Sequence, residues 1–426
     1  MAEIRDGTGN AADSGKSVAV VGAGIVGVAT AIWLQRAGHR VILIDRAEPG
    51  EGTSYGNGGV LASCSIVPVT VPGLLAKGPR MLFDPNQPLF LKWRYLPRLL
   101  PFLPRYLANC RADRVREIAA GLQLLIGDSL ADHQALANGT PAEKWIVPSD
   151  YAFLYRDRAH FAGDSFGWDI RRRHGFSWDE LEGDRLRAWD PVYSDIIGFA
   201  ARLPGHGRIS DPGRYVKDLA VHVERKGGRI VKADVEDIDR ENGVAKGVKA
   251  AGETIAADAV VLTTGVWSGP LVRRLGLDMP LESERGYHVE LFEPSVQPRA
   301  PVMVAAGKFV MTPMEGRLRL AGIVEFGGLD APPSRAPIDL LLRNVRETVT
   351  GIRWSRMETW MGHRPVLPDS LPVIDAVPGM DGAFLGFGHQ HIGLTAGPKT
   401  GRLLTQLVGD DKPNFNLAPY GANRFQ

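Results

Sequence analysis

Three glycines near the N-terminus have the types and the spacing that a phosphate-binding turn requires. They lie in residues 18–45, VAVVGAGIVGVATAIWLQRAGHRVILID, between two apolar stretches that read as strands. Gly22 permits a sharp turn, Gly24 lets the backbone approach a pyrophosphate, and Gly27 lets helix and strand pack closely. The N-terminus of the intervening helix favours negative charge, and Asp45 is placed to accept from a ribose hydroxyl. The pattern predicts a dinucleotide site and leaves open whether FAD or NAD occupies it.

A second glycine-rich segment, GTSYGNGG at residues 52–59, follows shortly after Asp45. Thr53 and Ser54 offer hydroxyl groups, Asn57 offers an amide, and the glycines let backbone N–H groups face phosphate or ring atoms. The longer FAD needs a second cradle here, whereas NAD does not. A glycine-rich surface turn is the alternative, but the segment favours a flavin.

The elements that must position these residues belong to a chain of 426 residues, long enough for two domains. Its 50 Lys and Arg against 48 Asp and Glu leave a net charge of +2, which excludes a global basic field for nucleic acid. Cys64 and Cys110 lack metal-ligand spacing and suit a reducing compartment, as two inert side chains or, less favoured, one bridge. Residues 1–16 are small and polar, which predicts a disordered leader rather than a secretory signal, so we expect a cytoplasmic protein.

The remaining pattern is α/β with interruptions. Residues 145–155 have strand character, and Asp211-Pro212 is typical of a helix start, with the helix running to Arg225. A hairpin turn is expected at 241–243 and a helix at 338–349. Short strands are predicted at 229–231, 235–239, 244–250, 254–255, 258–265, 289–292, 302–304, 309–311 and 318–324.

We therefore expect a Rossmann-like FAD-binding domain interleaved with a β-rich (α+β) substrate domain. The leader is residues 1–16. The cofactor domain is assigned to 17–80, 205–280 and 355–426, and the substrate or cap domain to 81–204 and 281–354.

Residues 81–107, MLFDPNQPLFLKWRYLPRLLPFLPRYL, interleave aromatic and leucine side chains with Arg and Lys and are broken by prolines. Short helices that pack over an active site as a lid would have this composition. So would a surface that makes a peripheral contact with the inner face of the cell membrane. The lid is the favoured interpretation. No uncharged apolar run of about 18 residues indicates a spanning helix.

Four ordered motifs together resemble the FAD-dependent D-amino-acid oxidase superfamily, most closely its bacterial D-amino-acid dehydrogenase group (small subunit type). They are the opening glycine unit, the 52–59 loop, LTTG at 262–265 and GHQHIGLT at 388–395. The resemblance extends over most of residues 17–410, although parts of 110–190 are not matched. It implies a D-amino-acid oxidase-like fold with bound FAD.

The resemblance also assigns residues to the cofactor. Relatives with covalent flavin link it to a His in the loop or to a Cys far downstream, and neither exists here, so non-covalent FAD is expected. The cofactor-binding residues are predicted to be Gly22, Gly24, Ile25, Val26, Gly27, Asp45, Arg46, Gly52, Thr53, Ser54, Asn57, Gly58, Gly59, Val235, Thr264, Gly265, Gly388, His389, Ile392, Gly393, Leu394 and Thr395.

On the substrate side, Arg364 stands in an Arg-Pro segment that resembles the arginine with which this superfamily binds a substrate carboxylate. Its rigid fork matches two carboxylate oxygens, although it could instead bind loop carbonyls or an acid. Tyr287 and His288 could contact the amine or carboxylate, or be a core tyrosine and a satisfied histidine. His391 lies in the distal loop beside the predicted flavin. His389 and His391 have no partner acid cluster, so no metal is expected.

The family implies hydride transfer from Cα of the amino acid to flavin N5, which yields an imino acid that water hydrolyses to a 2-oxo acid. We expect a D-amino acid, with D-proline or hydroxy-D-proline as candidates, and a quinone or another electron-transfer acceptor. A sarcosine or glycine oxidase-like enzyme that uses oxygen is the nearest alternative. A non-catalytic, flavin-holding subunit of a larger oxidoreductase is a further one.

Overall fold

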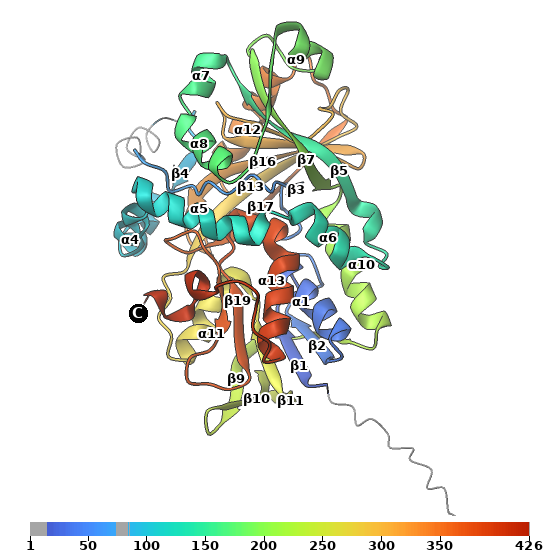
Figure 1. Cartoon of the computed structure of the whole chain (residues 1–426), viewed down its shortest axis with the longest axis vertical. Helices are drawn as coiled ribbons and strands as arrows, with labels where there is room; N and C mark the ends of the chain where they lie inside the picture. The colour runs from blue at the N-terminus through green and yellow to red at the C-terminus, as the bar shows by residue number, and fades with distance from the viewer. Residues whose placement is uncertain (1–14, 74–83, 85, 426) are drawn as a thin grey trace, which may run out of the picture.

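The computed structural model describes residues 15–73, 84 and 86–425. Residues 1–14 of the predicted leader, and residues 81–83 and 85 of the proline-rich segment, lie outside the described residues. Two large sheets organise the rest, and the chain passes between them several times. Figure 1 shows the smaller sheet in the lower half of the molecule and the larger one in the upper half.

The smaller sheet has six strands in the order β18-β19-β12-β1-β2-β8, all neighbours parallel except β18 and β19. Its inner strands are apolar because layers of structure cover both of its faces. The strands are β1 (Ser17–Val21), β2 (Arg40–Asp45), β8 (Arg229–Lys232), β12 (Ala259–Leu262), β18 (Val373–Ala376) and β19 (Ala383–Phe387).

Helices α1 (Ile25–Arg36) and α13 (Gly393–Val408) lie side by side over one face of this sheet (Figure 1). Two glycines of α13 allow the close approach. A Cβ at Gly397 would lie 2.8 Å from a side-chain carbon of Ile25, and one at Gly401 would lie 2.7 Å from the backbone of Ala29. The packing therefore brings the N-terminal ends of helices that are far apart in sequence to the same region.

The opposite face packs against α11 (Ser268–Arg274) and a small antiparallel sheet, β11-β10-β9. The predicted hairpin turn is confirmed, because Asn242 and Gly243 both have positive φ, 50° and 78°, between β9 and β10. The strands are β9 (Val235–Glu241), β10 (Val244–Ala250) and β11 (Glu253–Ala256).

The larger sheet follows the path β17-β13-β16-β15-β14-β5-β7-β3, with β4 beside β16 and β6 beside β7. One face buries apolar side chains under α12 (Ala336–Thr348), and the other turns toward the glycine-rich loop. Its strands are β3 (Val60–Leu61), β4 (Leu89–Leu91), β5 (Ile146–Tyr155), β6 (Asp179–Glu182), β7 (Phe199–Ile209), β13 (Glu282–Phe292), β14 (Val302–Val304), β15 (Phe309–Met314), β16 (Arg317–Phe326) and β17 (Arg356–Val366).

The predicted strand at 145–155 and helix at 212–225 are confirmed as β5 and α10 (Pro212–Arg225), and the Asp211 side chain accepts from the N–H of Arg214 as an N-cap. Outside the proline-rich segment, the other helices of the described residues are α5 (Ala112–Ile126), α6 (Ser129–Ala137), η2 (Glu143–Trp145), α7 (Arg158–Ala162), α8 (Ser165–Arg173), α9 (Gly183–Trp189), η3 (Gly265–Trp267), η4 (Gln390–Ile392), η5 (Ala418–Tyr420) and η6 (Ala422–Phe425).

Strand pairing differs from the predicted division of the chain at three places. Strand β3 and the end of β7 fall in ranges assigned to the cofactor domain but pair in the larger sheet, and β17 is the longest such stretch. Residues 355–426 were assigned to the cofactor domain, but β17 pairs with β13 over its whole length in the larger sheet. The sequence did not indicate this strand, because β17 begins with exposed polar residues and shows no alternation of apolar and polar residues that would distinguish it from a loop. The domain boundaries as a whole stay a prediction.

The proline-rich segment folds as β4, η1 (Trp93–Tyr95), α3 (Leu96–Leu99) and α4 (Phe102–Ala108). Phe102 and Tyr106 are buried against Phe326 and Val366 of the larger sheet, and the choice between lid and membrane contact stays a prediction. On the outer side Leu100 is 54% exposed. None of the helices in the described part of the chain combines the length and apolar character that crossing a bilayer requires.

Candidate active site

The turn after β1 is as tight as its glycines suggest. Gly22 has a φ of 105° and donates its N–H to the carbonyl of Ile44 at 2.7 Å. A Cβ on Gly27 would lie 1.8 Å from the carbonyl oxygen of Gly22 and 2.6 Å from Oγ1 of Thr263. Helix α1 begins with Gly24 as its N-cap and has no acid in its first turn, so its N-terminal dipole is not neutralised there. A pyrophosphate fits this end of the helix.

Asp45 ends β2 beside this turn. Its carboxylate accepts from the N–H of Ala23 at 2.7 Å and from the N–H of Ala47 at 2.9 Å. These contacts hold the acid at the carboxyl end of the sheet, where ligands of open α/β sheets bind. Arg46 lies over the ring of Trp267 at 4.0 Å.

Three other predicted cofactor residues, Thr264, Gly265 and Val235, lie near the same edge of the smaller sheet. Gly265, with a φ of 60°, and Thr264 follow β12, and the Thr264 hydroxyl is 2.9 Å from that of Ser268. Val235 begins β9, two residues after Ala233, whose N–H donates to the carbonyl of Asp45. These residues therefore lie near the carboxyl end of β2 and β12, and their contact with the cofactor stays a prediction.

Residues 52–59, which we call the cradle loop, are held by the side chains that were predicted to face a cofactor. Oγ of Ser54 accepts from the N–H of Ile25 at 3.0 Å, and Oγ1 of Thr53 donates to the carbonyl of His363 at 2.8 Å. Oδ1 of Asn57 accepts from the N–H of Gly59 at 2.9 Å. The loop therefore connects the N-terminus of α1 to strand β17.

A buried ion pair of the larger sheet binds the backbone of the cradle loop. Nη1 of Arg319 donates to the carbonyls of Tyr55 at 2.8 Å and Asn57 at 2.6 Å, and Nη2 lies 2.7 Å from Oε1 of Glu290. Burial opposes ionisation of Glu290, but Arg319 and Arg317 outweigh it and lower the pKa of the carboxyl group. Sequence reasoning missed this pair, although charges alternating with apolar residues in a strand were a visible signal.

His288 and Trp360 complete the contact between sheet and loop. The two rings are stacked with centroids 5.2 Å apart, and Nδ1 of His288 lies 3.1 Å from the carbonyl oxygen of Gly56. Burial, with the charge of Arg319, lowers the pKa of His288 to about 3, so the imidazole is neutral and donates this bond. His288 thus holds the loop. Its contacts are those of the alternative interpretation, a buried histidine that is hydrogen-bonded within the protein.

Arg364 lies on the same face of the sheet as His288, opposite Glu284 in the register. Its Nη1 lies 2.8 Å from Oε1 of Glu284, and the guanidinium also donates to the carbonyls of Gly322 and Ile323 at 3.1 and 3.2 Å. The side chain is 17% exposed. The fork is therefore satisfied by an acid and two carbonyls, as in the alternative interpretation of Arg364, and any carboxylate that bound there would have to displace part of this set.

The structure does not bring Tyr287 to this face. Its hydroxyl donates to Glu325 at 2.6 Å and accepts from the N–H of Ser334, and its ring packs in the apolar cluster with α12. Successive residues of a strand point to opposite faces, so the neighbour of His288 points away from the cradle loop. The core-tyrosine alternative describes Tyr287.

The distal loop reaches the site through η4 and α13. Gly388 has a φ of 86°. Nε2 of His389 lies 3.0 Å from the hydroxyl of Thr400, so this histidine connects the distal loop to helix α13. Burial, with the charge of Arg364 second, lowers the pKa of His391 to about 4. Thr395 contacts the carbonyl of Val60 at 3.4 Å. Ile392, Gly393 and Leu394 form the N-cap and first turn of α13, which has no acid.

The two cysteines are free thiols, so the bridge alternative does not apply. Burial raises the pKa of Cys64 to about 11, which makes its thiol unreactive at neutral pH. No group of three or more His, Cys, Asp or Glu residues in the described ranges is arranged to hold a metal ion.

Two helix N-termini without acids form a cradle that fits FAD, with the cradle loop bound to that of α1 and the residue after the loop, Val60, in contact with that of α13. The chain matches the family model for FAD dependent oxidoreductases, DAO, over residues 17–407. It is 38% identical over 418 residues to a D-amino-acid oxidase of Bradyrhizobium diazoefficiens, covering 96% of this chain and 99% of that protein. It is 29% identical to a D-amino acid dehydrogenase of Paramagnetospirillum magneticum, covering 96% and 98%.

Solved structures share the fold. Glycine oxidase from Geobacillus kaustophilus has a TM-score of 0.73 at 22% identity and covers 96% of this chain and 99% of its own. L-proline dehydrogenase from P. horikoshii has a TM-score of 0.71 at 17% identity, with 96% and 98% covered. Together, the family match, the full-length relatives and the fold show that this chain belongs to the DAO family of FAD dependent oxidoreductases and is an enzyme with FAD as its cofactor.

Proposed function

We propose that the enzyme oxidises a D-amino acid by transferring a hydride from its Cα to FAD. The observation that carries the proposal is the full-length similarity to proteins named for D-amino-acid oxidation, one of them 38% identical. The position of Arg364 supports it, because a guanidinium stands on the sheet face that meets the cradle loop. Bound FAD supplies the two-electron acceptor.

The chain's own residues bind and orient the substrate. Arg364 holds the carboxylate through its fork, which fixes the angle at which Cα approaches the cofactor. His288 stays neutral and keeps the cradle loop on the sheet, and Trp360 beside it excludes water. The amino acid loses a hydride from Cα and a proton from nitrogen. Water then hydrolyses the imino acid to a 2-oxo acid and ammonia, or opens the ring when the substrate is a proline.

The cofactor is proposed to be non-covalent. The cradle loop contains no histidine, and no cysteine follows Cys110. Acid precipitation should leave the yellow flavin in the supernatant, and a protein pellet that keeps its flavin after washing would show a covalent bond.

The acceptor is proposed to be a quinone or another electron-transfer partner. Oxygen is the second candidate, because the 38% identical relative is named an oxidase. Turnover of the same D-amino acid should be compared in air, by peroxide formation, and without oxygen, with a water-soluble quinone. Faster turnover with the quinone supports the dehydrogenase, and peroxide formed at the rate of substrate loss supports the oxidase.

The substrate class is tested by paired enantiomers, D- and L-alanine and D- and L-proline, with hydroxy-D-proline, sarcosine and glycine beside them. We expect turnover of D-enantiomers. Turnover of only sarcosine or glycine would favour the alternative whose fold the glycine oxidase structures share. No turnover of any amine by FAD-loaded protein would favour a non-catalytic subunit.

A peripheral membrane contact is proposed for the outer side of the proline-rich segment. Trp93 and Leu100 are 53% and 54% exposed there, close in sequence to Arg94 and Arg98. Sedimentation with anionic vesicles should bring down the native enzyme and less of a Leu100→Ser variant. Equal sedimentation of the two would contradict the contact and leave the segment as a lid.

A further inference from the structure

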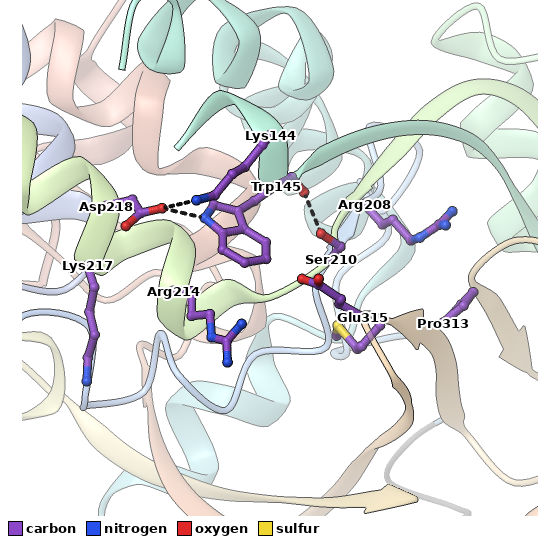
Figure 2. Close-up of a pocket in the computed structure, with 10 residues that line it drawn as sticks. Lys144, Trp145, Arg208, Ser210, Arg214, Lys217, Asp218, Pro313 and Glu315 are labelled. Carbon is purple, nitrogen blue, oxygen red and sulfur yellow. Dashed lines mark hydrogen bonds and ion pairs between the residues drawn. The ribbon is translucent and has the colours of Figure 1, made fainter. Parts of the chain in front are cut away.

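A pocket of about 830 Å³ has none of the predicted site residues in its lining (Figure 2), but it adjoins the cradle loop. Its walls come from η2 and the end of β7, from the first turns of α10, and from the end of β15 with the turn after it. This volume falls in the range of small-molecule sites. The lining residues are Lys144, Trp145, Arg208, Ser210, Arg214, Lys217, Asp218, Pro313, Met314 and Glu315.

The pocket has more positive charge than its own acids can balance. Asp218 is already used, since it accepts from Nε1 of Trp145 at 2.8 Å and lies 3.3 Å from Nζ of Lys144 (Figure 2). Lys217 pairs at 3.1 Å with Glu51, outside the pocket lining. The remaining charged groups of the pocket are the guanidinium groups of Arg208 and Arg214 and one exposed carboxylate, that of Glu315.

Neither arginine has a strong partner. Among the described residues, the guanidinium of Arg208 forms no hydrogen bond or ion pair, and its Nε is buried without an acceptor. The one acid that Arg214 reaches among the described residues is Asp211, whose Oδ2 lies 3.7 Å away and already accepts from Arg317 at 3.0 Å, and its Cζ lies 5.7 Å from the ring centroid of Trp145. A buried donor without an acceptor is costly, so Arg208 can gain an oxyanion at little expense. Arg214 is largely exposed, so its guanidinium is free to turn toward the same anion.

The same walls also offer apolar surface. The indole of Trp145 lies beside Arg214 in Figure 2, and Pro313 and Met314 line the pocket with it. A planar ring can pack on these side chains while its anionic groups meet the guanidinium forks.

We propose that this pocket binds a flat organic anion, a ring bearing carboxylate, sulfonate or phosphate groups, at a site separate from those of FAD and the amino acid. The pocket shares a wall with the cradle loop. Arg208 is paired with Val60 in the register of β7 and β3, and the N–H of Ile209 donates to the carbonyl of Gly59 at 2.7 Å. An occupant should therefore perturb the visible spectrum of the bound flavin.

The test uses the FAD-loaded enzyme and the dianion naphthalene-2,6-dicarboxylate, followed by calorimetry. The neutral naphthalene-2,6-dimethanol serves as the matched probe. We expect saturable binding of the dianion that weakens with salt and little binding of the diol. Arg208→Gln and Arg214→Gln should each lower the affinity at least about tenfold. The control, Arg225→Gln at the far end of α10, should not change it.

Three results would overturn the proposal. They are no saturable binding by the native enzyme, equal affinity in the glutamine variants, and displacement of the dianion by a D-amino acid, which would assign it to the substrate site. Arg214 is 66% exposed, so its variant is expected to fold, and retained FAD verifies this for both variants. The binding measurement does not depend on turnover, so its failure is separate from a failure of the proposed reaction.

Discussion

Arg364 is the residue on which the proposed recognition of a carboxylate depends. Lysine keeps its charge but loses the fork, so Arg364→Lys should raise the KM for the best D-amino acid at least about tenfold, with FAD still bound. Steady-state kinetics with flavin absorbance as a loading check measures this. Arg356→Lys, in the exposed part of the same strand, is the matched control and should match the native enzyme. An unchanged KM in Arg364→Lys would remove the residue from this role.

Arg319 holds the cradle loop rather than a substrate. Arg319→Met would leave the buried carboxylate of Glu290 without this partner and two loop carbonyls without a donor, at a cost of about 3 kcal/mol. We expect a lower free energy of unfolding and at least tenfold weaker FAD binding, with Arg319→Lys intermediate. FAD titration of the apoprotein measures the second effect. Arg335→Met, which breaks an exposed pair with Asp339, is the control. Native FAD affinity in Arg319→Met would contradict the assignment.

At this scale the sequence predicted best where residue type alone sets geometry. Gly22 and Gly27 were identified because only glycine fits the turn they form. The charges of β16 were visible in the sequence, but the pairing of Arg319 with Glu290, 29 residues away, could not be identified because the register between β13 and β16 determines it. The contacts of Tyr287 and His288 also depend on which face of β13 each one occupies, and the motif carries no such information.

Among the elements, the cradle loop lies so close to the larger sheet that one methyl group should displace it. A Cβ on Gly56 would lie 1.8 Å from the ring of Trp360, so Gly56→Ala must move either the loop or the indole. We expect reduced FAD content after purification and a shifted flavin spectrum. Gly269→Ala, in helix α11, where the nearest atom would be 3.6 Å away, is the control. A Gly56→Ala enzyme with native FAD content and spectrum would contradict this description of the loop.

The elements with regular patterns were predicted well, and those stabilised by buried charge were not. Strand β10 and helix α10 follow the expected ranges because their apolar spacing is clear. Strand β13 begins at Glu282, seven residues before the predicted start. Its first residues, Glu-Ser-Glu-Arg, look like a loop, but Tyr95 and Arg364 pair with the two acids and Glu325 pairs with the arginine.

At the scale of the whole molecule, buried histidines should make stability depend on pH. Burial lowers the pKa of His133 to about 4 and those of His288 and His389 to about 3. Between about pH 4 and 6.5 these groups bind protons in the unfolded chain but not in the folded one, so stability falls as pH falls. From pH 7 to 5.5 each should cost about 1 kcal/mol.

Urea unfolding of the FAD-loaded enzyme at pH 7, 6.2 and 5.5 measures this effect. His133→Gln removes one titrating group and should flatten the pH dependence, even though it also loses contacts with Tyr215 and the carbonyl of Leu394. Equal free energies of unfolding at pH 7 and 5.5 in the native enzyme would mean that these histidines titrate normally.

The interleaved architecture was predictable as a class because four motifs spread from residue 18 to residue 395 resemble one superfamily. Its detailed strand order was not, since β17 returns to the larger sheet from within a segment that otherwise belongs to the smaller one. Long-range pairing of this kind leaves no local pattern in a single sequence. The pocket of Figure 2 is a similar case, because three distant segments form it.

The most direct test of the central claim is anaerobic reduction of the enzyme-bound flavin by paired enantiomers, followed by its visible absorption. We predict that D-amino acids, D-proline among them, bleach the flavin at a rate that saturates with concentration, and that their L-enantiomers do not. Bleaching by L-enantiomers alone, or by sarcosine and glycine but no D-amino acid, would contradict the proposed function.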